Sequence, residues 1–193
     1  MPELTILALS GSLRKESYNA RLLTAAEYLA PPEMVLDRFL DLAAIPPFNE
    51  DAEHPAPSAV ADLRRRISTA DAVLIATPEY NAAIPGVLKN ALDWLSRPVE
   101  YGPPVLEHKP VAIIGASLGP LGTIRAQLGL RIVLHKMDAN VLRQPEFVLP
   151  YAAQHLTADD GLSGDTPTQA ILRKVIEGLG DLARNQRTIS SAD

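Results

Sequence analysis

Residues 11–19, with the sequence GSLRKESYN, combine the side chains and the position that suit an anion. They follow a short apolar run and precede a helical pattern, and the start of a helix presents free backbone N–H groups at the positive end of its dipole. Ser12, Ser17 and Asn19 add side-chain donors, and Arg14 adds a positive charge. We therefore predict a site for a phosphate monoester. The alternative is that Ser17 only caps a helix and that Arg14 is a solvated charge.

A second segment, TPEYNAAIPG at residues 77–86, places an aromatic ring, an amide and a carboxylate between two prolines. Prolines preset φ and lower the entropy cost of ordering a loop. Such a rigid loop can offer backbone N–H and C=O groups to the edge of a planar heterocycle. Two alternatives stay open: a plain turn in which Tyr80 covers the edge of a sheet, and a site in which Glu79 is a catalytic carboxylate.

A third segment, GASLGPLGT at residues 115–123, holds three glycines around the end of an apolar run. Glycines allow the backbone to approach a flat molecule closely, because they carry no Cβ. The segment therefore predicts a second surface for a planar ring, and its alternative is an ordinary turn from a strand into a helix.

Alternating strand and helix patterns position these three segments. Apolar runs predict strands, and apolar residues at helical spacing predict helices. The predicted strands are 4–9, 35–40, 72–76, 110–115 and 140–142, the predicted helices cover 22–29, 58–68, 86–95, 122–136 and 168–182, and 41–57 reads as a polar loop rich in proline. The alternation predicts an α/β fold in three layers, with a doubly wound parallel sheet of about five strands covered by helices on both faces.

The predicted sheet brings the three segments together. They follow the first, third and fourth strands, and the carboxyl ends of parallel strands lie at one edge of the sheet. In such sheets ligands bind beyond these ends, near the point where the strand order reverses. We therefore expect one site built from all three segments.

Composition limits the classes of function. The chain has 193 residues, of which 47% are apolar and 21% charged, and we expect one domain at 1–187 with a frayed tail at 188–193. A net charge of −5 argues against a protein that coats nucleic acid or an anionic membrane. Because Cys is absent, redox chemistry would need a bound cofactor. We expect a cytoplasmic location, since no run reaches the length of a membrane span and the first residues, MPE, lack the basic start of a signal peptide.

The stretches GSLRKESYN, TPEYNAAIPGVLKNALDWLSRP and GASLGPLGTIRAQLGLR together resemble the NADPH-dependent FMN reductases, from Leu4 to about Glu146. That family includes bacterial quinone, chromate and azo-dye reductases. The resemblance implies a flavodoxin-like fold with strand order 2-1-3-4-5. Two residues depart from the family pattern: Thr123 stands where a second glycine of a Gly-Gly pair is expected, and Ala83 stands where serine is common.

The resemblance also implies the cofactors and the residues that bind them. Ser12, Arg14, Ser17 and Asn19, with Tyr18 beside them, would hold the FMN phosphate; Pro78, Glu79, Tyr80 and Asn81 would line the isoalloxazine and ribityl groups, mostly through backbone groups; and Ser117 with the following glycines, Gly119 included, would flank the other side. NAD(P)H would donate hydride to the flavin, and a small acceptor, typically a quinone, would then take the place of the nicotinamide. The flavin performs this chemistry, so no catalytic side chain is expected.

Two other classes of function stay open. A flavodoxin-type electron carrier would also bind FMN, but carriers are usually strongly acidic, and the modest net charge of −5 favours an enzyme. A nucleoside-processing transferase on a similar sheet would use Glu79 as a nucleophile. It would need no phosphate loop, so residues 11–19 argue against it.

The helix predicted at 86–95 suggests an oligomer. Leu88, Leu92 and Leu95 define one apolar face, and Val87, Ala91 and Trp94 define a second. A helix on the outside of a three-layer monomer needs one such face, so the second predicts a partner chain. We expect a homodimer or homotetramer, as the family resemblance also implies.

Several chemically capable residues carry no prediction of function. The four His residues are scattered without the spacing of metal ligands, so no metal site is expected. The basic run Arg64–Arg66 is interpreted as a solvated helix face. Trp94 is interpreted as a packing residue rather than a platform for a ring.

Overall fold

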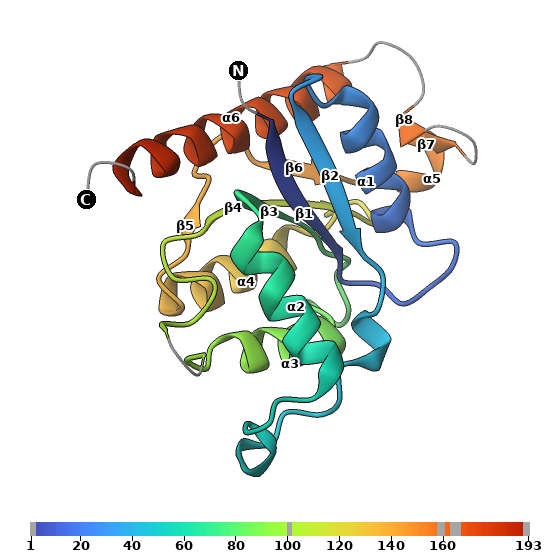
Figure 1. Cartoon of the computed structure of the whole chain (residues 1–193). Helices are drawn as coiled ribbons and strands as arrows, with labels where there is room; N and C mark the ends of the chain where they lie inside the picture. The colour runs from blue at the N-terminus through green and yellow to red at the C-terminus, as the bar shows by residue number, and fades with distance from the viewer. Residues whose placement is uncertain (1–2, 100–101, 158–160, 163–166, 191–193) are drawn as a thin grey trace.

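The computed structural model describes residues 3–99, 102–157, 161–162 and 167–190. Its main sheet is parallel and runs in the order β2-β1-β3-β4-β5, with β6 also paired to β4 (Figure 1). The strands are β1 (Leu4–Ser10), β2 (Met34–Phe39), β3 (Ala72–Ala76), β4 (Pro110–Ala116), β5 (Asn140–Val141) and β6 (Phe147–Leu149). This confirms the predicted doubly wound, flavodoxin-like arrangement.

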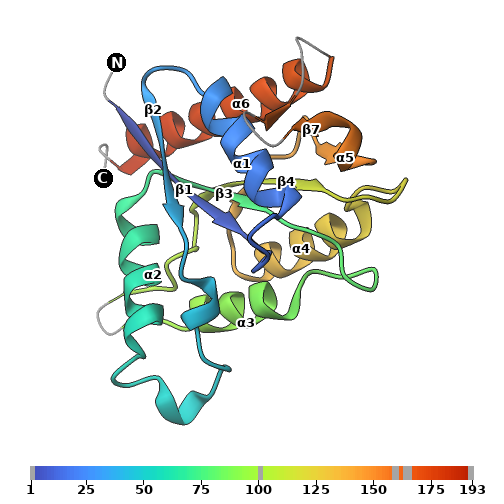
Figure 2. The ribbon, with the colours of Figure 1, turned by 90° about the vertical axis from the view of Figure 1, so that its right-hand side faces the viewer.

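Helices cover both faces of this sheet, as Figure 2 shows. One face carries α1 (Tyr18–Leu29) and α6 (Pro167–Ser190), and the other carries α2 (Ser58–Thr69), α3 (Gly86–Leu95) and α4 (Ile124–Lys136). The short elements are the 3₁₀ turns η1 (Leu42–Ala44) and η2 (Glu50–Ala52), helix α5 (Ala152–His155), and the antiparallel pair β7 (Leu156–Thr157) and β8 (Gly161–Leu162). Among the described residues, no helix is both long and apolar enough to span a membrane.

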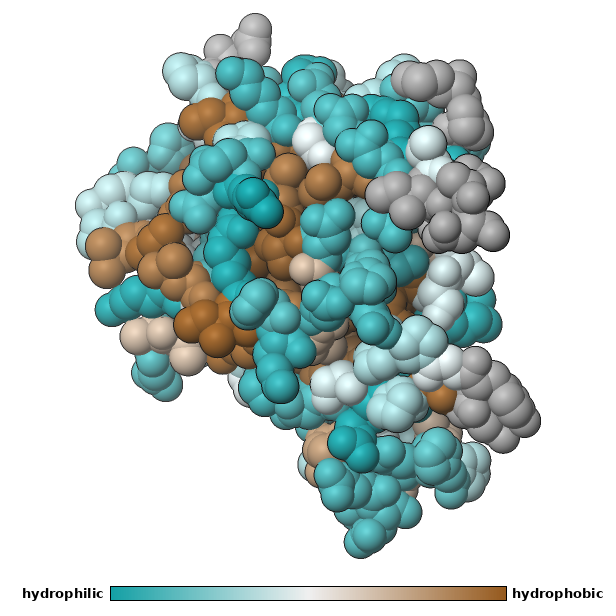
Figure 3. Space-filling model, turned by 90° about the vertical axis from the view of Figure 1, so that its left-hand side faces the viewer, coloured by the Kyte–Doolittle hydropathy of each residue, from teal (hydrophilic) through white to brown (hydrophobic). Residues whose placement is uncertain are grey.

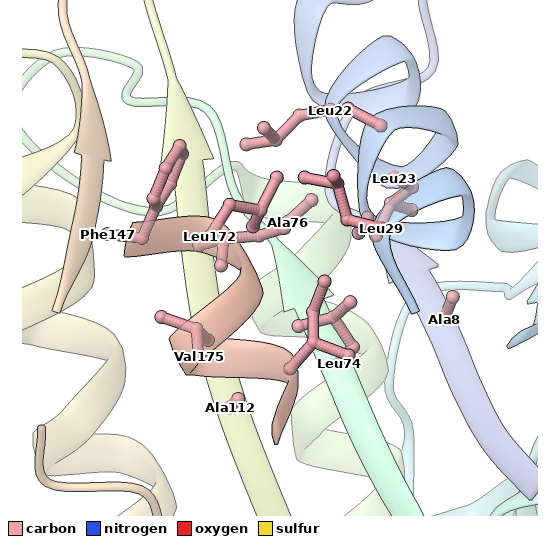
Figure 4. Close-up of a cluster of buried hydrophobic side chains, with 14 of the residues drawn as sticks. Ala8, Leu22, Leu23, Leu29, Leu74, Ala76, Ala112, Phe147, Leu172 and Val175 are labelled. Carbon is pink, nitrogen blue, oxygen red and sulfur yellow. The ribbon is translucent and has the colours of Figure 1, made fainter. Parts of the chain in front are cut away.

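The core lies in two apolar layers, one on each side of the sheet. Successive side chains of a strand point to opposite faces, so Ile6 and Ala8 join the layer under α1 and α6, while Leu7 and Leu9 join the other. Figure 4 shows the first layer, in which side chains of both helices meet those of the sheet. It labels Leu22, Leu23 and Leu29 of α1, Leu172 and Val175 of α6, and Ala8, Leu74, Ala76, Ala112 and Phe147 of the sheet.

The fifth position of the sheet is divided between two short strands. β5 pairs with the start of β4, and β6, which the sequence did not predict, pairs with its end. Pro145 interrupts the edge between them, because proline offers no N–H to a strand ladder. Arg131 of α4 fills the gap, donating to the Leu142 carbonyl at 2.9 Å and lying 3.3 Å from the Glu146 carboxylate.

Helix α6 is longer than predicted. It continues past residue 182 to Ser190, so residues 188–190 are helical rather than a frayed tail, and 191–193 lie outside the described residues. The side chain of Arg187 explains the extension. It donates to both Asp71 carboxylate oxygens, at 2.5 and 2.6 Å, and to the Glu3 carbonyl at 3.0 Å, which ties the end of the helix to the sheet.

Two of the three residues on the second apolar face of α3 are buried within the chain and Val87 is half-buried, so this face does not indicate a partner. Ala91 and Trp94 are at most 1% exposed. The loop 41–57 covers them: the Trp94 indole donates to the Pro46 carbonyl at 2.8 Å, and the Phe48 ring meets Trp94 edge-on with ring centres 5.1 Å apart. The sequence argument failed because it treated this loop as polar and did not expect it to pack. The prediction that Trp94 is a packing residue is confirmed.

The basic run on α2 is also not a solvated face. Arg64 is 8% exposed and donates to the Trp94 carbonyl at 2.8 Å. Arg66 pairs with Asp37 and donates to the Arg38 carbonyl at 2.8 Å, while Arg65 lies in solvent. Two of these arginines therefore tie α2 to its neighbours.

Candidate functional site

The three loops after β1, β3 and β4 converge on one hollow, as predicted. Its volume is about 170 Å³, and each of the three loops contributes to its lining. Lining residues from the predicted set are Ser12, Arg14, Ser17, Tyr18 and Asn19, then Pro78, Glu79 and Tyr80, and then Ser117. Ala116 and Leu118 complete the wall, whereas Asn81 and Gly119 lie outside it.

The first loop presents several unused donors to this hollow. The amide of Arg14 donates to the Ser12 hydroxyl at 3.4 Å. The amides of Leu13, Lys15, Glu16 and Tyr18, by contrast, form no hydrogen bond within the part of the chain that the structure describes. The Arg14 side chain is exposed, and no described carboxylate pairs with it. Free N–H groups beside an unpaired guanidinium are what a phosphate dianion requires.

Ser17 caps helix α1. Its hydroxyl oxygen is buried and accepts from the amides of Asn19 at 3.2 Å and Ala20 at 3.3 Å. The N-cap interpretation is therefore correct. It does not exclude contact with an anion, because the hydroxyl proton is still free to donate.

The Asn19 side chain has a structural partner in β4. Its Nδ2 donates to the Ala116 carbonyl and its Oδ1 accepts from the Ala116 amide, both at 3.0 Å. The side chain is 2% exposed and joins the start of α1 to the end of β4. The last residue of β4 has backbone groups that need partners, and Asn19 satisfies them. Because the amide NH₂ has a second hydrogen and Asn19 lines the hollow, the expectation that it also holds the phosphate stays a prediction.

The second loop is a tight hairpin. Tyr80 and Ala83 exchange two backbone hydrogen bonds of 3.0 Å, and the two residues between them, Asn81 and Ala82, have φ values of 51° and 64°. This is the geometry of a type I′ turn, in which asparagine is favoured and alanine is strained. The Tyr80 hydroxyl lies 3.4 Å from the Ser12 hydroxyl and links this loop to the first.

The Glu79 carboxylate caps helix α4. It accepts from the amides of Arg125 at 3.0 Å and Ala126 at 3.1 Å, and from Arg125 Nε at 2.6 Å. The N-cap residue of α4, Thr123, makes no capping bond with its own side chain, so Glu79 takes that role. No local signal identified this role, because Arg125 lies 46 residues further along the chain.

This arrangement fixes the charge of Glu79. Burial raises the pKa of its carboxyl group, but the hydrogen bonds from Arg125 and Ala126 and the Arg125 charge outweigh burial and hold the pKa below its ordinary value. The side chain is 5% exposed and stays ionised. A carboxylate held by four donors is poorly placed to attack a substrate, so the structure does not support Glu79 as a nucleophile.

The third loop is held in place mainly by hydrogen bonds and close contacts among its own residues. The Ser117 hydroxyl donates to the Gly122 carbonyl at 2.6 Å. A Cβ at Gly115 would lie 2.0 Å from Thr123 Oγ1 and 2.5 Å from the Thr77 carbonyl oxygen, so glycine is required there. Thr123 itself is buried, with its hydroxyl accepting from Gln127 at 3.0 Å. It therefore packs inside the molecule rather than against a ring in the hollow.

Fold and site together define a class of protein. The sheet is doubly wound and parallel, and the loop after its first strand has the free donors of a phosphate site. Two further rigid loops border the same hollow. This combination defines a flavodoxin-like FMN-binding domain. Residues 4–154 match the sequence model of the NADPH-dependent FMN reductases, and the chain belongs to this family. It is an oxidoreductase that uses FMN with NAD(P)H as co-substrate.

Relatives agree with this assignment. The chain is 42% identical to an NAD(P)H-dependent FMN reductase of Pseudomonas aeruginosa, over 90% of this chain and 92% of the relative. It is 37% identical to a 2-hydroxy-1,4-benzoquinone reductase of a Burkholderia species, over 95% of this chain and 98% of the relative. Its fold resembles that of FerB, the flavoenzyme NAD(P)H:(acceptor) oxidoreductase of Paracoccus denitrificans, with a TM-score of 0.85, 34% identity, and coverage of 94% and 98%.

Proposed function

We propose that the protein passes hydride from NAD(P)H, through FMN held in the three-loop hollow, to a quinone-type acceptor in the cytoplasm, where these nucleotides are available. The observation that carries the proposal is the first loop, with its unused amides and the unpaired Arg14. Bound FMN supplies the hydride chemistry. In total, NAD(P)H, a proton and a quinone give NAD(P)⁺ and a hydroquinone, so two electrons and two protons reach the acceptor.

The chain binds and orients the reactants in this proposal. Arg14, the hydroxyls of Ser12 and Ser17, and the free amides up to Tyr18 hold the phosphate. Backbone groups of the second loop, at Pro78, Tyr80 and Asn81, border one side of the flavin ring. Backbone groups of the third loop, at Ser117 and Gly119, border the other side. Asn19, which is tied to Ala116, has a second amide hydrogen for the phosphate. Glu79 acts indirectly, because its carboxylate is occupied in holding the second loop against α4.

An FMN titration tests the cofactor part of the proposal. We expect about one FMN per chain, a yellow protein, and quenching of FMN fluorescence on binding. The same preparation should oxidise NADH or NADPH when a benzoquinone is added. A protein that stays colourless and does not quench added FMN would remove the proposal, while FMN binding without nicotinamide oxidation would favour an electron carrier.

We also propose that the protein is a homodimer or a dimer of dimers, joined through α4. The exposed side of α4 and the turn before it carry Leu121, Leu128 and Ile132, which are 51%, 52% and 72% exposed. Apolar surface gathers on the side of the molecule where α4 and β5 lie (Figure 3). Large apolar side chains at helical spacing on one face favour a second copy packed by two-fold symmetry. This would place both cofactor sites near the interface, because Glu79 ties the second loop to the start of α4.

A further inference from the structure

A groove at the edge of the sheet opposite the cofactor site has no part in the proposed function. Asp71 immediately precedes β3 and Pro110 begins β4, and both line this groove, whereas the three-loop hollow lies where the same strands end. The end of α2, the turn before β4 and one side of α6 complete the lining. Its volume is about 500 Å³, which is in the range of small-molecule sites.

Lys109 reaches into this groove without forming an ion pair. Its Nζ donates to the Ala70 carbonyl at 2.7 Å, and no carboxylate of the described residues pairs with it. Burial lowers the pKa of the Lys109 ammonium group, and the charge of Asp71 offsets this effect only in part. The half-buried ammonium group has two further N–H donors, and an anion in the groove would stabilise its charge.

The Asp71 carboxylate in the same groove is already used. It accepts from the Thr5 amide at 2.8 Å and from Nε and Nη2 of Arg187 at 2.5 and 2.6 Å. The charge of Arg187 therefore matches that of Asp71, and Lys109 is left without a counter-charge of its own. Nη1 of Arg187 forms no hydrogen bond within the described part of the chain, so it is a second donor for an anion.

The remaining groups of the groove limit the charge and the shape of a ligand. Glu107 forms no ion pair within the described residues and adds one negative charge to the lining, while Nδ1 of His108 lies 3.2 Å from the carboxylate of Asp138. A dianion would place excess negative charge near Glu107 and Asp71, whereas a monoanion would balance Lys109. Apolar side chains form much of the rest of the lining, namely Ala70, Pro110 and Ala183.

We propose that this groove binds a small organic monocarboxylate, with the carboxylate on Lys109 and on Nη1 of Arg187 and the apolar body against α6 and the start of β4. Hydrogen bonds between charged groups are about twice as strong as neutral ones, so the carboxylate provides most of the specificity. The site is separate from hydride transfer, because the groove and the three-loop hollow share no lining residue in the described chain.

Benzoate tests the proposal on the FMN-loaded protein, with benzamide as its uncharged match. Binding is followed by NMR through the backbone amides of the groove, and flavin absorption reports on the cofactor site in the same samples. Two variants remove opposite charges from the groove. Lys109→Met removes the ammonium group, and Glu107→Gln, two residues earlier in the same turn, removes a carboxylate and keeps its shape.

We expect benzoate to shift the amides of Ala70, Asp71 and Lys109 saturably, and benzamide to bind at least about tenfold more weakly. Lys109→Met should weaken benzoate binding by about tenfold or more, because it removes a charged donor. Glu107→Gln should strengthen it by about two- to threefold, because it removes a like charge. Flavin absorption and the rate of NADPH oxidation should stay unchanged.

Three results would overturn the proposal. The first is equal benzoate affinity in wild type and Lys109→Met, and the second is equal affinity of wild type for benzoate and benzamide. The third is a change in flavin absorption with amide shifts confined to residues 12–19, which would place benzoate at the cofactor site. If Lys109→Met does not fold, Glu107→Gln still decides, because unchanged or weaker benzoate binding in that variant would exclude an anion from this groove.

Discussion

At the scale of single residues, the polar side chains at the site divide into two groups. Arg14 and the free amides near it have no partner in the described chain and remain available to a ligand. Asn19 and Glu79 are hydrogen-bonded to distant backbone groups and hold other parts of the site in place. Polar groups of one site therefore contribute in different ways, and substitutions should separate the two groups.

Arg14→Ala should weaken FMN binding by about ten- to a hundredfold, because a charge-assisted hydrogen bond to phosphate contributes about 1.5–3 kcal/mol. Riboflavin has no phosphate, so its affinity should stay nearly unchanged. Fluorescence quenching titrations with both ligands measure the difference. Equal losses for FMN and riboflavin would place Arg14 away from the phosphate.

Glu79→Gln should leave NAD(P)H–quinone turnover within about tenfold of wild type, a change in barrier near 1.4 kcal/mol. The carboxylate is occupied by Arg125 and the start of α4, and hydride transfer between rings needs no side-chain nucleophile. Steady-state oxidation of NADH and NADPH with benzoquinone and excess FMN measures this. A thousandfold fall with FMN still bound would instead make Glu79 a catalytic residue.

The same carboxylate should make stability depend on pH. Its pKa is lower in the folded chain than its ordinary value of 4.5, so its ionisation stabilises the fold fully above that value and progressively less as the pH falls through the lowered folded pKa. We expect wild type to have a higher Tm than Glu79→Gln near neutral pH, and the difference to shrink below about pH 4. A difference that is constant from neutral to acid pH would mean that the charge of Glu79 contributes nothing.

At the scale of elements, the third loop depends on contact between β4 and the turn that starts α4. Gly115→Ala should lower the free energy of unfolding by about 1–3 kcal/mol, because the new methyl group would overlap Thr123 and the Thr77 carbonyl. Gly119→Ala in the same loop is the matched control, since its Cβ would meet only Ser117 Oγ, at 3.9 Å. Urea unfolding of both variants checks this, and equal losses would show that the loop does not depend on this contact.

At the scale of the whole molecule, α4 connects the cofactor site with the surface that we assign to a second copy. Ile132→Glu places a charge where the exposed apolar side chains of α4 gather, and we expect it to convert the dimer into a monomer at about micromolar concentration. Light scattering measures the mass, and FMN titration reports whether the site survives. Tyr28→Glu, at a residue 80% exposed on α1, is the control and should not change the mass. A monomeric wild-type protein would overturn the assembly.

Much of this molecule follows from local sequence. The apolar runs at β1, β3 and β4 and the helical spacing in α1 to α4 predict the layers, because side-chain periodicity encodes burial directly. The motifs after those strands predict where the loops converge, because parallel strands bring their carboxyl ends together. The free amides of the phosphate loop agree with its position at the start of a helix.

Tertiary structure alone decided what the polar side chains do. Asn19 pairs with Ala116, 97 residues away, and Glu79 caps a helix that begins 45 residues later in the chain, at Ile124. Likewise, the loop 41–57 covers Trp94, and Arg187 holds α6 in a helical form to Ser190. The sequence shows which side chains are apolar and at what spacing they recur. It does not show their hydrogen-bond partners, because these depend on which distant backbone group lies within about 3 Å after folding.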